Sequence, residues 1–481
     1  MDEGHGHPHG GRPVTAPPGS SRYIEAGRHR RPASRLSGAT RGVAPRVGTL
    51  VACLIVASLL VGGCGGGSSP RPTTPAVAPS ASVRAPVATP VPSEPAGLTP
   101  VRLLLRWTLG AEFAGYVAAI DQGFYEAAGI DLTLVEGGPD IFPEVVGSEM
   151  SGPEFTISWV PRVLQAREAG ASDLVDIAQV FRRSATLSIS FRDLEVTRPA
   201  DLKGHELGVL GAGNEFEVTA AAKAAGLDID RDVTLVEQDT GMRDFLRGRI
   251  DVAQVTIYDG YAQVLEATDP ASHLPYQPTD FNVINYHDEG TAMLQDAVFA
   301  RASWLAQDGN EELASRFLRA SFQGWMFCRD HPGDCVEAVV AAGEIAAPDA
   351  SASPGASASP GASAATGSPA ASAAPDESPG ASPDPGASPP VSRLRVGHEA
   401  WAMNEVNPLI WPAPGGIGVL DPAEWQRTVD VCLAAGVIVA PPSGDAYRTD
   451  LAESALATLE GLDTTGEAFV KGTVEITPEA P

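Results

Sequence analysis

The chain has 481 residues, with 33 Lys and Arg against 60 Asp and Glu, and a formal net charge of −27 at pH 7. An acidic surface of this kind repels nucleic acid and anionic lipid headgroups, so the composition argues against both as partners. The length allows two or three ordinary domains, although Gly (51) and Pro (42) gather mostly in two biased stretches. The sequence therefore predicts a self-repelling secreted protein of which only part folds.

An export segment comes first. Residues 50–63 read LVACLIVASLLVGG after an arginine-rich start, which is short for a membrane span and typical of the apolar region of a signal peptide. The segment ends in Val61-Gly62-Gly63-Cys64, which resembles a bacterial lipobox. We expect cleavage before Cys64 and a lipid on its sulfur; a transmembrane anchor with an incidental cysteine is the alternative. The region before residue 50 is long for a signal, so either it is a long leader or translation starts further in.

Two stretches are expected to stay unfolded. Residues 64–99 are rich in Pro, Ser, Ala and Thr and predict an extended tether. Residues 347–390 repeat Ala-Ser-Pro-Gly without a large apolar side chain. Such a segment buries too little apolar surface to offset the entropy of ordering, so it predicts a disordered surface insert.

From Val101 onward, short apolar runs alternate with helical spacing. Strands are predicted at 101–107, 130–135, 155–159, 174–181, 187–191, 206–210, 233–237 and 252–257. Helices are predicted at 113–128, from 161, at 215–225, at 245–247, from 302 and again from 395 to 459. Alternating strands and helices in two blocks predict an α/β protein with two lobes, each a parallel sheet with helices on both faces.

The cysteines do not form a disulfide scaffold. Cys328 and Cys335 are seven residues apart, and on one continuous helix they would lie about 10 Å apart, too far to bridge. Pro332 breaks the helix between them, so a small disulfide-closed turn and two reduced thiols both remain open. A metal site using His331 is disfavoured because no fourth ligand lies nearby in sequence.

Several motifs resemble one family. RWTLGAEFAGY (106–116), QGFYEAAGIDL (122–132) and EGGPD (136–140) are similar to the start of the thiamine-pyrimidine-type (NMT/THI-like) substrate-binding proteins of ABC importers. The segments PADLKG (199–204), GNEFE (213–217) and DEGTAM (288–293) fit the same family, and WAMNE (401–405) and AYRTD (446–450) resemble its riboflavin-binding branch.

The resemblance implies a two-lobe periplasmic-binding-protein fold (type II) with two crossover strands and the ligand between the lobes. Lobe one would comprise 100–192, 287–346 and 391–470, and lobe two 193–286, with a signal region at 1–63 and a tail at 471–481. It also implies an ABC permease and ATPase as partners, a lipid-anchored position outside the cell membrane, and no cofactor.

The candidate site begins with Trp107, at the carboxyl end of the first predicted strand, which is the edge where parallel sheets bind ligands. By resemblance its ring stacks on a heteroaromatic ligand; a core tryptophan is the alternative. Asn214 and Glu215 join a strand to a helix and are candidates to read the ligand's polar edge, or simply to cap that helix. A second tier of candidates comprises Asp140, Trp159, Tyr258, Asp288 and Glu289, for which turn, core and hinge roles are the alternatives.

The expected ligand is a thiamine-pyrimidine precursor or riboflavin. Family members that take the thiamine precursor often carry Pro-Asn after the Trp-Thr pair, whereas this chain has Leu109-Gly110, which leaves room for a flavin. Nitrate- or sulfonate-type ligands are the alternative.

Catalysis is not expected. The family also includes a pyrimidine synthase, which needs a Schiff-base lysine. The three lysines, Lys203, Lys223 and Lys471, lie in a turn, a helix and the tail, and no Ser-His-Asp, Cys-His or zinc-spaced set stands out. A surface sensor or adhesin would need a partner domain that the sequence does not suggest.

Overall fold

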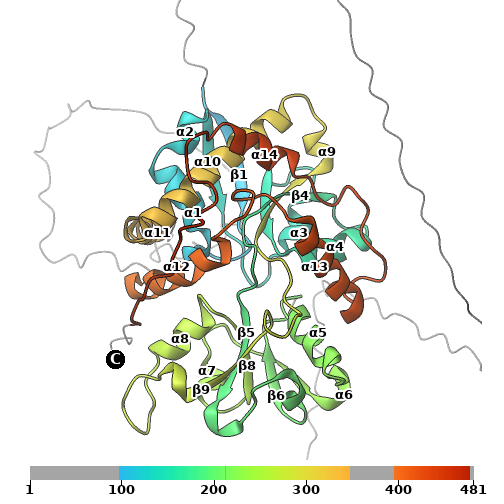
Figure 1. Cartoon of the computed structure of the whole chain (residues 1–481), viewed down its shortest axis with the longest axis vertical. Coiled ribbons are helices and arrows are strands. Elements are labelled where there is room, and N and C mark those ends of the chain that lie inside the picture. Colours follow the sequence, from blue (N-terminus) through green and yellow to red (C-terminus); the bar gives the residue numbers. More distant parts are fainter. Residues whose placement is uncertain (1–96, 212, 347–394, 477–481) are drawn as a thin grey trace, which may run out of the picture. The chain divides into compact units, whose positions relative to one another are not determined.

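The computed structural model describes residues 97–211, 213–346 and 395–476. The predicted lipidation residue Cys64, the signal region and the 347–390 insert lie outside the described residues, as does most of the tether. Figure 1 shows the described elements grouped in two lobes, each built around one β-sheet. None of the helices in the described ranges is long and apolar enough to cross a membrane.

The first sheet has the strand order β2-β1-β3-β10-β4. Its strands are β1 (Thr99–Leu104), β2 (Ile130–Val135), β3 (Phe155–Ser158), β4 (Leu174–Gln179) and β10 (Ala297–Arg301). Strands β1, β2 and β3 are parallel, whereas β10 is antiparallel to both of its neighbours. Every side chain of β3 and β4 is buried, as expected for strands covered by helices on both faces.

The second sheet repeats this plan with the order β7-β6-β8-β5-β9. Its strands are β5 (Thr186–Phe191), β6 (Glu206–Val209), β7 (Thr234–Glu237), β8 (Val252–Thr256) and β9 (Phe281–Asn285). Strands β6, β7 and β8 are parallel, and β5 is antiparallel to β8 and β9. Each sheet therefore contains one antiparallel strand that follows directly on a crossing between the lobes.

Two expectations are corrected by this topology. The sheets are mixed rather than parallel, because β5 and β10 arrive from the other lobe and not through a crossover helix within their own sheet, which would impose parallel pairing. Residues 186–191 were also placed in the first lobe, whereas β5 pairs only with strands of the second sheet. The first crossing therefore lies between β4 and β5, before the expected boundary at residue 192.

Helices cover both sheets. In the first lobe they are α1 (Ala114–Asp121), α2 (Phe124–Ala127), α3 (Pro143–Val146), α4 (Val160–Glu168), α9 (Ala302–Leu305), α10 (Asn310–Asp330), α11 (Pro332–Ala346), α12 (Val396–Ile410), α13 (Pro422–Ala435) and α14 (Asp450–Ala457). In the second they are α5 (Phe216–Ala224), α6 (Ile229–Asp232), α7 (Arg243–Leu246) and α8 (Gly260–Glu266). Short 3₁₀ turns lie at Ala111–Phe113, Arg192–Leu194, Pro199–Leu202 and Pro278–Asp280.

Close packing of α1 on α10 anchors the core of the first lobe. A Cβ atom on Gly324 would lie 1.9 Å from the Gly115 carbonyl oxygen, and one on Gly115 would lie 2.1 Å from the Trp325 ring. Both helices therefore require glycine where they touch, because no larger residue fits at these distances. On the sheet side of α10, the Phe317 ring stacks on Phe155 with ring centroids 3.9 Å apart.

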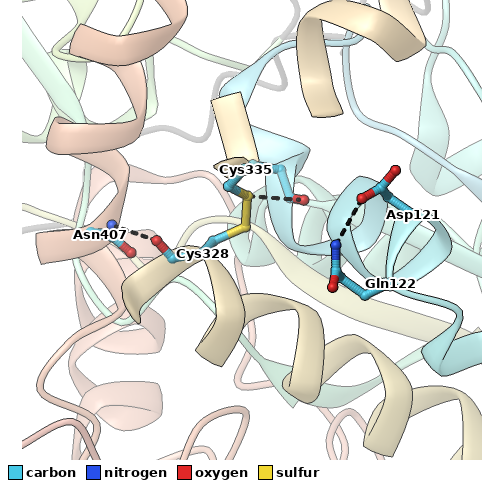
Figure 2. Close-up of a disulfide and its surroundings, with 6 residues drawn as sticks. Asp121, Gln122, Cys328, Cys335 and Asn407 are labelled. Atoms are coloured by element: carbon cyan, nitrogen blue, oxygen red, sulfur yellow. Dashed lines mark hydrogen bonds between the residues drawn. A yellow bond between two sulfur atoms is a disulfide. The ribbon is translucent and has the colours of Figure 1, made fainter. Parts of the chain in front are cut away.

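A disulfide joins Cys328, in the last turn of α10, to Cys335, in the first turn of α11 (Figure 2). Their Cα atoms lie 5.2 Å apart, because α10 ends at Asp330 and α11 starts afresh at Pro332. The helix break that the proline predicts is thus what brings the two sulfurs together. Cys432 is free and buried, and burial raises the pKa of its thiol to about 12, so it is a structural rather than a reactive cysteine.

Candidate ligand-binding cleft

The carboxyl ends of parallel strands from both sheets meet at one cleft. Its inner hollow is lined by the residues that follow β1 and β3 in the first lobe and β6, β7 and β8 in the second. These lining residues are Arg106, Trp107, Glu112, Trp159, Leu210, Asn214, Gln238, Thr240, Met242, Gln254, Val255, Thr256, Tyr258, Asp259 and Gly260. Ligands of α/β proteins bind beyond the carboxyl ends of the strands. The position of this cleft in the fold therefore makes it the candidate ligand-binding site.

An outer hollow continues from the inner one toward helix α12. The two share Trp107, Glu112, Thr240, Tyr258 and Asp259, and the outer hollow adds Thr108, Leu109, Gly110, Gln263, Arg395, His398, Glu399 and Ala402. Their volumes are about 520 and 750 Å³, including the mouth open to solvent. The space that a water-sized molecule can enter is about 250 Å³ in the outer hollow and about 40 Å³ in the inner one, so the outer hollow offers most of the room for a ligand.

A buried arginine holds the aromatic wall of the cleft in place. The Arg106 Nε donates to Asp296 Oδ1 at 3.0 Å, and one terminal nitrogen donates to the Tyr258 hydroxyl at 3.2 Å. The guanidinium carbon also lies 4.6 Å from the centre of the Trp159 ring. Burial opposes the charge of Arg106, but Asp296, Tyr258 and Glu112 outweigh it and raise its pKa. Arg106 therefore ties β1, the second crossover and the second lobe together around the rings.

Three carboxyl groups border the outer hollow: Glu112, Asp259 and Glu399. Burial raises the pKa of Glu112 to about 8 against the opposing effect of Arg106, and burial likewise raises the pKa of Glu399. Glu399 Oε2 accepts the Ala111 N–H at 2.7 Å, which fixes it at the start of the short turn that carries Glu112. These groups present hydrogen-bond acceptors to whatever occupies the hollow.

Helix α12 is bound to helix α8 of the second lobe by ion pairs beside the hollow. Glu266, buried on α8, accepts from Arg395 at 2.6 Å and from His398 Nδ1 at 3.1 Å. The other ring nitrogen of His398 lies 3.5 Å from Asp259. Trp401 Nε1 also donates to the Ile257 carbonyl at 3.1 Å. These contacts therefore attach the α12 side of the cleft to the second lobe.

Protonation of His398 gives this contact a pH dependence. Burial opposes the charge, but Asp259 and Glu266 raise the pKa of His398 from 6.5 to about 10. A raised folded-state pKa contributes stability that is complete below 6.5 and is lost as pH rises through about 10. We expect the free energy of unfolding, measured with urea at pH 6, 8 and 10, to fall over this range, and less steeply in His398→Gln. The same decline in wild type and variant would contradict the assignment.

The loop after β6 presents a polar residue to the inner hollow. Asn214 is only 6% exposed, and its Nδ2 donates to the Gly211 carbonyl at 2.8 Å. The backbone carbonyl oxygen of Asn214 accepts a hydrogen bond from Gln254 Nε2 at 2.5 Å. Glu215 occupies the N-cap position of α5 without a capping hydrogen bond from its side chain, whose Oε2 accepts the Gly213 N–H at 3.0 Å instead. Asn214 is thus held rigidly at the cleft, whereas Glu215 stabilises the loop beside it.

Hydrogen bonds hold together the two segments that cross between the lobes. Glu217 on α5 accepts from the Ser184 hydroxyl at 2.6 Å and from the Met293 N–H at 2.7 Å. Gln295 bonds across from the second crossover to Ser184, the Ala185 N–H and Thr186. Burial raises the pKa of Glu217 to about 8. One buried carboxyl group of the second lobe therefore holds both connecting segments.

The cleft gathers four of the eight predicted ligand residues: Trp107, Trp159, Asn214 and Tyr258. Asp140 is exposed in a turn, and Asp288 and Glu289 are exposed in the turn that follows β9. Glu215 is beside the cleft without lining it. Four predicted ligand residues therefore do not line the described cleft: Asp140, Glu215, Asp288 and Glu289.

Sequence reasoning missed several residues that line the cleft, among them Arg106, Glu112, Asp259, His398 and Glu399. Arg106 and Glu112 lie in the same motif as Trp107, at 106–116. A charged residue close in sequence to a predicted stacking residue could therefore have been predicted to line the cleft. His398 and Glu399 are nearly 300 residues away from Trp107 in sequence, and no local pattern connects them. Among the described residues, no three His, Cys, Asp or Glu side chains are placed to hold a metal ion.

Part of the chain is similar in sequence to known proteins. The family model described as NMT1/THI5 like matches residues 110–335. Riboflavin-binding protein RibY of Chloroflexus aurantiacus is 28% identical over 272 residues, covering 56% of this chain and 71% of that protein. A formylaminopyrimidine-binding protein of Halalkalibacterium halodurans is 24% identical over 252 residues, covering 52% of this chain and 72% of that protein.

A solved structure from Bordetella bronchiseptica RB50 has the same fold, with a TM-score of 0.50 and 14% identity over 75% of this chain and 98% of that one. The fold is therefore shared with that structure. Residues 110–335 of this chain are similar to the NMT1/THI5-like family.

Proposed function

We propose that this chain is the solute-binding component of an ABC importer and that it captures a planar heteroaromatic molecule, a flavin or a thiamine-type pyrimidine. The observation that carries the proposal is the meeting of Trp107, Trp159 and Tyr258 in one cleft between the lobes. Planar ligands are held by aromatic faces together with a few fixed polar groups. Arg106, Asn214 and the three carboxyl groups supply the polar part.

The flavin is the first candidate ligand. The outer hollow borders Gly110, where a Cβ atom would lie 2.6 Å from Glu112 Oε2. A glycine here lets the Glu112 carboxyl group lie against the backbone, where it borders the outer hollow. The relative with the higher identity of the two is named for riboflavin, and the second is named for formylaminopyrimidine.

Binding would close the lobes without covalent change. The crossovers joined by Glu217 form the hinge, and a ligand that contacts both lobes favours the closed state. A permease and an ATPase would then receive the closed form. The chain is not expected to be an enzyme, since no lysine is among the described residues that line the cleft and could form a Schiff base.

We place the protein outside the cell membrane, held by a lipid on Cys64. The Cys328–Cys335 disulfide supports an oxidising compartment. Nitrate- or sulfonate-type ligands are the second candidate class. They are less favoured because both arginines that border the cleft are already paired with carboxylates.

A thermal-shift titration of the full chain tests the proposal. Riboflavin, formylaminopyrimidine, hydroxymethylpyrimidine and thiamine are compared with nitrate and an alkanesulfonate. A ligand that binds only the folded state raises the unfolding midpoint with its concentration above Kd. We expect riboflavin or one of the pyrimidines to raise it. A shift with nitrate or sulfonate alone would overturn the heteroaromatic assignment.

A further inference from the structure

The polar atom that Asn214 leaves for a ligand is an acceptor. Its Nδ2 is committed to the Gly211 carbonyl at 2.8 Å, which fixes the orientation of the amide because only the nitrogen can donate to a carbonyl. The Oδ1 is buried and has no hydrogen-bond partner among the described residues, although Asn214 lines the inner hollow. A buried acceptor without a partner is costly, so the hollow is complete only when a donor occupies it.

The same polarity continues into the outer hollow. Glu112 is 8% exposed and borders both hollows. Asp259 and Glu399 border the outer one as well. A ligand lying between Trp107 and these groups therefore meets oxygen acceptors along its polar edge.

The cations near the cleft are already neutralised by other acids. Arg106 is paired with Asp296, and Arg395 is paired with Glu266. His398 lies between Glu266 and Asp259. Together with these partners, five carboxyl groups lie in or beside the cleft: Glu112, Asp259, Glu266, Asp296 and Glu399. The cationic side chains named above are fewer, namely Arg106, Arg395 and His398. No cationic group that lines the described cleft is left to receive an anion.

We propose that the cleft selects ligands whose polar edge carries N–H donors and that it rejects their phosphate esters. The inference rests on the proposed function and adds to it the charge class of the ligand. An amino or imide edge satisfies the acceptor oxygens of Asn214 and Glu112, whereas a phosphate finds the cations beside the described cleft already paired with carboxylates. The ligand would then have to lose any phosphate before capture, so a phosphatase-type reaction would supply it from phosphorylated precursors.

Calorimetric titration of the full chain with two matched pairs of probes tests this selection. The pairs are riboflavin with flavin mononucleotide, and hydroxymethylpyrimidine with its phosphate ester. We expect the unphosphorylated member of whichever pair binds to have at least a tenfold lower Kd. At pH 9 the Glu112 carboxyl group is ionised, because its pKa is about 8. We expect Glu112→Gln to narrow the Kd ratio several-fold at that pH, because it removes the charge while keeping the shape, and the exposed control Glu312→Gln to leave the ratio unchanged.

The outcomes separate the two proposals. Equal or tighter binding of a phosphate ester would overturn the selection while leaving the proposed function intact. An unchanged ratio in a folded Glu112→Gln protein, as judged by its unfolding midpoint, would also overturn the assignment of the selection to this carboxyl group. Binding by neither pair, together with no midpoint shift from formylaminopyrimidine or thiamine, would overturn the proposed function and, with it, the selection.

Discussion

Replacing Trp107 with alanine is expected to weaken binding of the heteroaromatic ligand about 30-fold or more. Trp107 is half-buried, borders both hollows and packs at the edge of the core of the first lobe. Loss of one aromatic stacking face removes about 2 kcal/mol of binding free energy, and each 1.4 kcal/mol changes Kd about tenfold. Calorimetric titration of wild type and variant measures the change directly.

Trp304 provides the matched control. It is also a partly buried tryptophan packed against the same core, where its ring makes an edge contact with Phe155, but it does not line the cleft. Trp304→Ala is expected to lower the unfolding midpoint while leaving Kd unchanged. If both variants lose affinity alike, or if Trp107→Ala binds as tightly as wild type, Trp107 does not form the stacking face.

The largest effect on stability is expected from Asp296→Ala, at about 3–5 kcal/mol of unfolding free energy. Asp296 is 3% exposed and pairs with Arg106, which is 7% exposed. The alanine variant leaves a buried guanidinium with a single hydroxyl as its nearest described polar partner, Tyr258. A buried charge without its counter-ion is far more costly than a lost surface pair. Urea unfolding followed by circular dichroism measures the loss.

Asp445→Ala is the control for this prediction. Asp445 also pairs with an arginine, Arg167 at 2.9 Å, but its side chain is 75% exposed. Exposed pairs contribute about 1 kcal/mol or less, so this variant should unfold close to wild type. The double variant Arg106→Met with Asp296→Leu should regain much of the stability, because it removes both charges together. A loss below about 1 kcal/mol in Asp296→Ala would show that Arg106 is solvated rather than buried.

Strands were predicted well wherever an apolar run stood alone between turn signals. The strand at 130–135 is observed with those bounds, and those at 155–159 and 206–210 are each shorter by one residue at the end. The helix expected at 113–128 is two helices, because Gly123 adopts a left-handed conformation with φ of 71° and breaks it. Strand direction could not be predicted, since β5 and β10 become antiparallel through the path of the crossovers and not through their own composition.

The site could be predicted where the sequence places an aromatic residue directly after a strand. Trp107, Trp159 and Tyr258 each follow a strand end and lie in the cleft. Exposed acids next to glycine turns, such as Asp140, were equally conspicuous in sequence but remain in their turns. The acceptor character of the site could not be predicted, because it depends on which partners neutralise Arg106 and Arg395, and those partners come from distant segments.

A crystal structure of the complex with the compound that raises the unfolding midpoint most is the most direct test of the account. The account predicts a planar ring against Trp107 in the cleft between the lobes, with its N–H edge toward Asn214 or Glu112 and no phosphate beside the carboxyl groups. A ligand seated elsewhere, for example in the groove between α11 and α12, or a ring that lies in the cleft without touching Trp107, would contradict it.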